Sequence, residues 1–256
     1  MFFSQGRPTS YDVDLALGRI PGHTGVAVVM RNSTTSNTAF TDVWGGGGNI
    51  VLPSTAVSLE VSSSDYNDTA AGTGARTVLI STLADTYGVQ TPITVELDGQ
   101  NPIAIPGTHY RPNHLTATSG AFVLTAGSNE TNIGDITIRA AGGGDVMMVV
   151  TAGTSKSEDG IMVVPLGITA LLRQVIINWG KDQSGDVTSS SRPPAADSAI
   201  ISSGQVNLYQ NNLQLIYQTL IRVGETGEVI YRAQSANLGA SVVVIQELEM
   251  VDNSVI

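Results

Sequence analysis

The sequence lacks cysteine and is poor in charged and aromatic residues. The absence of cysteine from its 256 residues excludes disulfides, thiolate catalysis and cysteine-ligated zinc. Charged residues make up 13% of the chain, about half the usual share, and aromatic residues make up 5%. Helical bundles carry Lys, Glu and Arg on their exposed faces and disordered chains are highly charged, so the composition disfavours both. Hydrophobic residues still reach 41%, which indicates a chain with a real core.

Positive charge is scarce. The chain has 12 basic and 22 acidic residues, a net charge of −10, and only two lysines, Lys156 and Lys181. Clustered Lys and Arg hold phosphate backbones and anionic lipids, so we expect neither nucleic acid nor a membrane as a partner. No apolar run is long enough to span a bilayer. Residues 1–8 lack the basic and apolar regions of a secretory signal peptide, so we expect a protein that stays in a cytoplasm or leaves the cell by a non-secretory route.

Most apolar stretches are short, β-branched and bounded by Gly, Pro, Asn or Asp, which is the pattern of strands. Ile93, Val95 and Leu97 alternate with polar residues and predict a strand with one buried face. Residues 212–223 fit a strand or a helix, and their β-branched and aromatic content favours the strand. The predicted strands cover residues 26–30, 50–52, 57–61, 76–83, 93–97, 122–124, 136–139, 146–150, 161–164, 170–179, 205–209, 213–223, 228–233 and 242–251.

Closely spaced strands without amphipathic helices between them predict an all-β fold of antiparallel β-sandwich or jelly-roll modules. We expect a jelly-roll-like sandwich over residues 131–256, a small β module over residues 46–130 and an extended N-terminal arm over residues 1–45. Residues 171–178 are largely apolar on both faces, which predicts a strand covered on both sides. Residues 181–198 are polar and contain proline, which is typical of a long loop.

The glycine and acidic patterns give only weak evidence for a ligand site. Gly72 and Gly74 form a Gly-x-Gly pair, but a strand and not a helix follows, so a tight turn is favoured over a dinucleotide site. Asp65, Asn67 and Asp68 supply three oxygen ligands where a calcium loop needs about five. An Asx-turn is therefore favoured over calcium at these residues.

Catalytic and metal-binding patterns are equally weak. His109 and His114 are five residues apart, which matches neither helical nor strand spacing of metal ligands, so loop histidines are favoured over a metal on a trimer axis. No Gly-x-Ser-x-Gly elbow is present. Glu247 and Glu249 share one face of the last strand. They fit a solvated rim or a subunit contact, and acids in a cleft are less favoured. We predict no enzyme, no catalytic residue, no cofactor and no metal, so the residues alone indicate a binding or structural protein.

Several blocks of the sequence resemble a family of virion structural proteins from tailed phages. The most specific block reads Asn-Asp-Thr-Ala-Ala-Gly-Thr-Gly-Ala-Arg-Thr-Val at residues 67–78. Further similarity lies in residues 17–23, 42–48, 60–64, 94–99, 132–139, 162–167, 229–233 and 248–252.

The resemblance implies a particle component without catalysis. We expect a capsid decoration or cement protein that binds the outer surface of a phage head and stabilises it. The alternative is a neck, tail or head-fibre component that binds a receptor or a glycan. The expected partner is the major capsid protein of the same virion, and the expected location is the capsid surface, after assembly in the host cytoplasm. A homotrimer is expected, because surplus apolar strand surface such as residues 242–245 needs cover and trimers suit three-fold positions on a shell.

The N-terminal arm is the predicted attachment element. Its apolar anchors are Phe2, Phe3, Tyr11 and Phe40, followed by Trp44 at its end. An extended arm adds backbone pairing to a neighbour's sheet edge while its side chains fill pockets. The alternative is that the arm packs on its own subunit as an edge strand.

Overall fold

The computed structural model confirms an all-β chain with antiparallel sheets. It describes residues 2–4, 7–9, 11–84, 88–112, 122–124, 132–154, 157–158, 161–180, 183–192, 201–208 and 212–255. Within these ranges the secondary structure is strands, one short α-helix and one 3-10 turn. No helix in the described ranges is long and apolar enough to cross a membrane.

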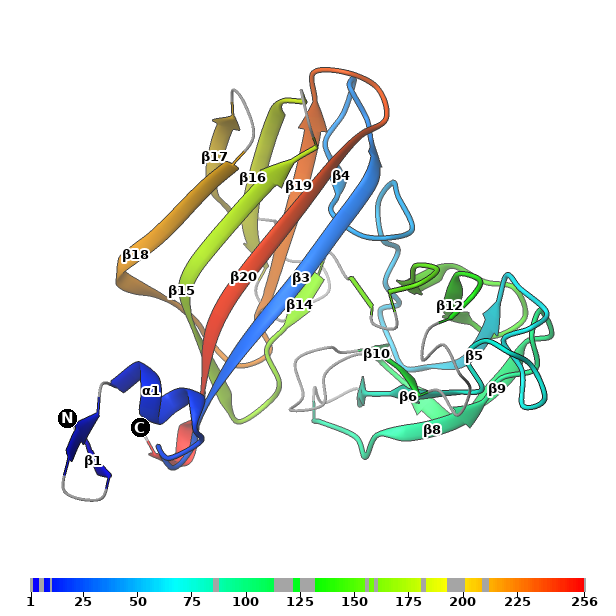
Figure 1. The fold of residues 1–256 in the computed structure, drawn as a ribbon, viewed down its shortest axis with the longest axis horizontal. Helices are drawn as coiled ribbons and strands as arrows, with labels where there is room; N and C mark the ends of the chain where they lie inside the picture. The colour runs from blue at the N-terminus through cyan, green and yellow to red at the C-terminus, as the bar shows by residue number, and fades with distance from the viewer. Residues whose placement is uncertain are drawn as a thin grey trace.

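Two sheets form a β-sandwich (Figure 1). The first, called the β20 sheet, has the order β18-β15-β20-β3, and the second, called the β19 sheet, has the order β14-β19-β16-β17 with β4 paired to β19. The β20 sheet contains β3 (His23–Thr35), β15 (Ile168–Trp179), β18 (Asn212–Val223) and β20 (Ala240–Asp252). The β19 sheet contains β4 (Thr41–Asp42), β14 (Ile161–Val163), β16 (Gly185–Arg192), β17 (Ile201–Leu208) and β19 (Glu228–Ser235).

The sandwich core lies between the facing sides of these sheets. Alternate residues of the long strands, such as Met30, Ile177 and Val244, point inward and meet Met162 and Tyr231 from the other sheet. This period of two is the reason that β-branched residues at every second position specify the core face.

A second unit, called the inserted lobe, lies in the chain between β4 and β14. One of its sheets has the order β13-β12-β5-β9 and another has the order β11-β6-β8, while β7 and β10 pair with each other. Its core is separate from that of the sandwich and includes Leu59, Val78, Ile80, Ile136 and Met148. The strands are β5 (Val57–Ser63), β6 (Thr77–Ile80), β7 (Thr82–Leu83), β8 (Ile93–Glu96), β9 (Ile103–His109), β10 (Arg111–Pro112), β11 (Phe122–Leu124), β12 (Ile136–Ala140) and β13 (Val146–Val150).

The two chain ends lie near each other at one end of the sandwich (Figure 1). A hairpin of β1 (Phe2–Ser4) and β2 (Arg7–Thr9) precedes α1 (Tyr11–Ala16), and η1 (Asn253–Val255) follows β20. The backbone N–H of Asp252 donates to the Gly22 carbonyl oxygen at 2.8 Å, which ties the end of β20 to the start of β3.

The sheets divide the chain differently from the three segments expected from the sequence. Within residues 1–45, β3 pairs with β20 along almost its whole length and β4 pairs with β19, so this stretch supplies sandwich strands. Within residues 131–256, β12 pairs with β5 and β13, so both strands belong to the inserted lobe. The sandwich is built from strands that lie on both sides of the inserted lobe in the sequence. Local patterning does not reveal such long-range pairing.

The structure confirms one local prediction and corrects another. Residues 212–223 form the strand β18, as their β-branched content predicts. The polar stretch expected as a loop instead contains β16, which pairs with both β17 and β19. Val187 in β16 is buried in the sandwich core, so a single apolar residue among Ser and Thr anchors a central strand there.

Candidate functional site

The N-terminal helix α1 is held against the outward face of the β20 sheet. The Tyr11 hydroxyl donates to the Glu249 carboxylate on β20, and His23 Nδ1 lies 2.6 Å from Glu249 Oε1. Burial raises the pKa of Tyr11 to about 12, and the bond to Glu249 adds to the rise because ionised Tyr11 loses its donor. Glu249 is only 2% exposed, so this acceptor is part of the structure and not of a solvated rim.

A second set of contacts completes the anchoring of α1. The Arg173 guanidinium on β15 pairs with Asp12, and this bond raises the pKa of Arg173. Leu15 is buried, and a Cβ added at Gly25 would lie 3.7 Å from its Cγ. A six-residue helix is unstable by itself, so these tertiary contacts are the reason that α1 forms. They fix the position of α1 on the sandwich.

The five predicted attachment residues do not gather at one place. Phe2 and Phe3 belong to β1, but their side chains lie outside the described residues. Tyr11 is on α1, and Phe40 is half-buried just before β4. Trp44 is 4% exposed and donates its Nε1–H to the Gly48 carbonyl oxygen at 3.2 Å, so its indole is an interior group that holds a turn.

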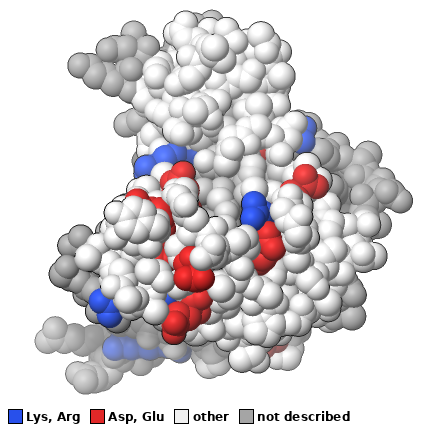
Figure 2. Space-filling model, turned by 90° about the vertical axis from the view of Figure 1, so that its right-hand side faces the viewer, with Lys and Arg blue, Asp and Glu red and all other residues white. Residues whose placement is uncertain are grey.

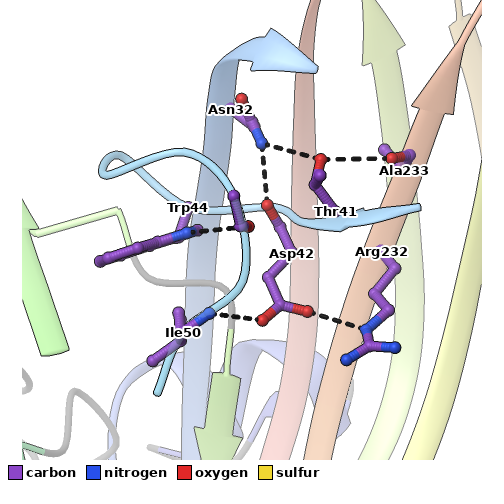
Figure 3. A network of polar contacts seen from close by, with 8 residues as sticks. Asn32, Thr41, Asp42, Trp44, Ile50, Arg232 and Ala233 are labelled. Carbon is purple, nitrogen blue, oxygen red and sulfur yellow. Dashed lines mark hydrogen bonds and ion pairs between the residues drawn. The ribbon is translucent and has the colours of Figure 1, made fainter. Parts of the chain in front are cut away.

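The neighbourhood of Trp44 is a buried polar network that joins β3, β4 and β19 (Figure 3). The Asp42 carboxylate accepts from Arg232 Nε at 2.9 Å and from the Ile50 N–H at 2.8 Å. Asn32 Nδ2 donates to the Asp42 carbonyl oxygen at 2.8 Å. Satisfied buried groups of this kind specify one arrangement of the chain, so the network has a structural role.

The block of residues 67–78 folds around the Asp68 carboxylate. One oxygen of Asp68 accepts from the Ala75 N–H at 2.8 Å and from the Ile133 N–H at 2.9 Å. The other accepts from Ser63 Oγ at 2.6 Å and from the Gly134 N–H at 2.8 Å. Asp68 is 0% exposed, so four donors hold a fully buried carboxylate.

These contacts favour the Asx-turn over a calcium loop and the tight glycine turn over a dinucleotide site. The Asn67 N–H donates to Asp65 Oδ1 at 2.8 Å, which is the predicted Asx-turn. A Cβ at Gly72 would lie 1.9 Å from the Asn67 carbonyl oxygen, and one at Gly74 would lie 2.1 Å from Asp68 Oδ1. The glycines are therefore required by close backbone approach in a tight turn. In the described part of the chain no three His, Cys, Asp or Glu side chains form a group that could hold a metal.

His109 is not the loop residue that its sequence context suggests. It is 2% exposed at the end of β9, with Nε2 donating to the Pro106 carbonyl oxygen at 3.0 Å. Nδ1 lies 2.9 Å from Thr82 Oγ1 and 2.6 Å from Gln90 Oε1. Burial lowers the pKa of His109. The signal was available in the sequence, because Ile103, Ile105 and His109 share the inward period of two.

An ion pair between Arg111 and Glu228 joins the inserted lobe to the sandwich. Both side chains are almost fully buried, and the Arg111 guanidinium also lies 4.7 Å from the centre of the Tyr110 ring. A small cleft beside this pair is lined by Ile50, Leu52, Arg111, Pro112, Met147, Met148, Ile161 and Val163. Sequence patterning does not reveal the pair, because Arg111 and Glu228 belong to separate units of the chain.

Charge is thinly spread over the surface. Figure 2 shows one face of the molecule, on which small groups of acidic and basic side chains are separated by a largely uncharged surface. Within the acidic pair on the last strand, Glu247 is exposed and Glu249 is buried under α1. The pair is therefore split between solvent and the α1 contact and does not line a cleft.

Comparisons with known proteins give no family for this chain. No protein-family model matches it, and no curated protein matches it. A solved tandem CBM22-1-CBM22-2 domain of Paenibacillus barcinonensis Xyn10C is 10% identical, with 90% of this chain and 93% of that chain covered and a TM-score of 0.21.

Two further solved structures are particles of infectious bursal disease virus. The Gt strain structure is 10% identical, with 95% of this chain and 87% of that chain covered and a TM-score of 0.18. The T13 viral particle is also 10% identical, with 90% and 74% covered and a TM-score of 0.19. TM-scores this low carry no argument about function.

Proposed function

We propose that this chain is a non-enzymatic virion structural protein that decorates the outer surface of a phage head and stabilises it. The observation that carries the proposal is the convergence of separate blocks that resemble phage virion proteins. Residues 60–64, 67–78 and 132–139 meet around Asp68, and the Gly99 N–H adds a bond to the Asp68 carbonyl oxygen at 2.9 Å. Sequence similarity that folds into one buried structural unit supports a shared architecture for the inserted lobe.

The proposed partner is the major capsid protein of the same virion. With a net charge of −10, the chain suits an outward position or contact with protein better than contact with packaged DNA. We place the copies on the capsid surface as trimers, after assembly in the host cytoplasm. No residue is assigned a catalytic role.

The N-terminal segment is the proposed attachment element, and the position of α1 indicates which of its residues would contact the capsid. Contacts of Tyr11, Asp12 and Leu15 hold α1 on the sandwich, so we assign the capsid contact to the β1–β2 hairpin that precedes it. Figure 1 shows the β1–β2 hairpin projecting beyond α1. A two-stranded hairpin is marginal alone, and pairing with a capsid subunit would stabilise it.

The experiment is decoration of phage particles that lack this protein. Purified full-length chain, a variant without residues 1–10, and the exposed-site control Leu238→Ser are added to such particles, and bound copies are counted by cryo-electron microscopy. We expect the full chain and the control to cover the shell and the shortened chain to stay in solution. Equal occupancy by the shortened chain overturns the arm as attachment element. Copies confined to the neck or tail overturn the decoration role in favour of a receptor- or glycan-binding component.

A further inference from the structure

The outward face of the β20 sheet carries a row of partly exposed apolar residues. Ile176, Ile245 and Val29 are register neighbours on β15, β20 and β3, and all three point away from the sandwich core. Each is half-buried, although their inward neighbours in the same strands are buried. Figure 1 shows the ribbons of these strands unobstructed above α1. Solvated sheet faces usually carry polar residues at such positions, so this row marks a contact surface.

The rows on either side of the apolar row differ in charge and in hydrogen-bonding groups. Along the strands in one direction lies the row of Asn178, Val243 and Arg31. In the other direction lies the row of Gln174, Glu247 and Ala27. The Arg31 side chain is 46% exposed while it holds an ion pair with Glu158 at 3.2 Å, so much of this side chain remains open to solvent. Glu247 is exposed.

The basic residue Arg31 lies on one side of the apolar row and the acidic residue Glu247 lies on the other, so two copies of this face can have complementary charges. We propose that the face binds a second copy of this chain, turned end for end about a two-fold axis along the Ile176–Ile245–Val29 row. The apolar rows of the two copies then pack on each other, and Asn178 of each copy faces Gln174 of the other. Arg31 comes within reach of Glu247 of the second copy, because the side chain spans the distance of about 5 Å between neighbouring strands. Facing sheets pack about 10 Å apart, which leaves room for side chains of this size.

The helix α1 sets the limit of the contact. It occupies the same face at the level of Gly25, Glu249 and Arg173, so a second copy packs only beyond it. The pairing goes beyond the proposed virion role and is tested without a virion. It is compatible with trimers, since copies in adjacent trimers on an icosahedral shell are related by two-fold axes.

The test is sedimentation equilibrium of the purified full chain over a range of micromolar concentrations. We expect the mass to rise above that of a monomer as concentration increases. Ile245→Lys should weaken association about a hundredfold or more, since it places an unpaired charge in the contact. Leu238→Lys is the matched control and should leave association unchanged, because Leu238 is 78% exposed in the turn between β19 and β20 and is not part of the apolar row.

A charge exchange tests the orientation. Glu247→Arg should weaken association about three- to tenfold, and the double variant Arg31→Glu with Glu247→Arg should restore it. Glu247 is exposed, so this variant keeps its fold even if Ile245→Lys does not. A wild-type chain that stays monomeric overturns the proposal, as does association that Ile245→Lys and Glu247→Arg both leave unchanged. Loss of capsid occupancy in Ile245→Lys with a monomeric wild type would assign the face to the capsid protein instead.

Discussion

Replacement of Asp68 by Ala should unfold or loosen the inserted lobe while leaving the sandwich intact. The change removes a buried carboxylate that accepts from the N–H groups of Ala75, Ile133 and Gly134 and from Ser63 Oγ. Each buried donor left without a partner costs about 1–3 kcal/mol, and local relaxation recovers part of the sum. We therefore expect a loss of about 3–6 kcal/mol in the free energy of unfolding of the lobe. Asp68→Asn keeps one acceptor oxygen and should cost about half as much.

Hydrogen exchange measured by mass spectrometry is the assay, because it separates the two units of the chain. Peptides that contain Ala75 and residues 133–134 should exchange faster in Asp68→Ala. Peptides from β20, which belongs to the separate sandwich core, should keep their protection. Asp98→Asn is the matched control, because Asp98 is an exposed turn carboxylate whose Oδ2 accepts from Asn101 Nδ2 at 3.0 Å. An Asp68→Ala protein with wild-type exchange in the lobe would refute the structural role of the carboxylate.

Three further substitutions test the ion pair between the two units, the buried histidine of the lobe and the contact that holds α1. Arg111→Met removes the ion pair of the buried Glu228 carboxylate with Arg111 and should cost about 3–5 kcal/mol in urea unfolding, while the double variant with Glu228→Leu should recover most of that loss. Burial holds the pKa of His109 below its ordinary value of 6.5, so its neutral form stabilises the lobe above pH 6.5 and this contribution falls as pH drops below it. His109→Gln should flatten that acid dependence in thermal unfolding, and an unchanged profile would contradict it. The pKa of Tyr11 is raised from 10.0 to about 12, so the bond to Glu249 is fully present below pH 10 and is lost as pH rises through about 12. Proteolysis near α1 should therefore accelerate at alkaline pH, and Tyr11→Phe should show the fast cleavage already at neutral pH; equal rates in both proteins would argue against the anchor.

The class of fold follows from local pattern. Alternation in residues such as Ile93 and Val95 and the turn residues between strands specify an all-β chain, because a strand exposes one face at every second residue whatever its partner. The same rule predicts β18 as a strand and places His109 inward, whereas the spacing of the histidines alone favours a loop residue. The Asx-turn at Asp65 is also local, and the polar residues Asp65, Asn67 and Asp68 predict it.

The partners of the strands and the chemistry of the site depend on tertiary structure. β3 pairs with β20 across most of the chain, and β12 pairs with β5, so the boundary between sandwich and inserted lobe is set by long-range pairing. The same long-range contacts bury Trp44, which the sequence suggested as an attachment residue. They also bring Arg111 to Glu228 and the helix carrying Tyr11 to Glu249. Period and turn chemistry act over a few residues, whereas a buried ion pair or a partly exposed apolar row across three strands exists only after distant strands have met.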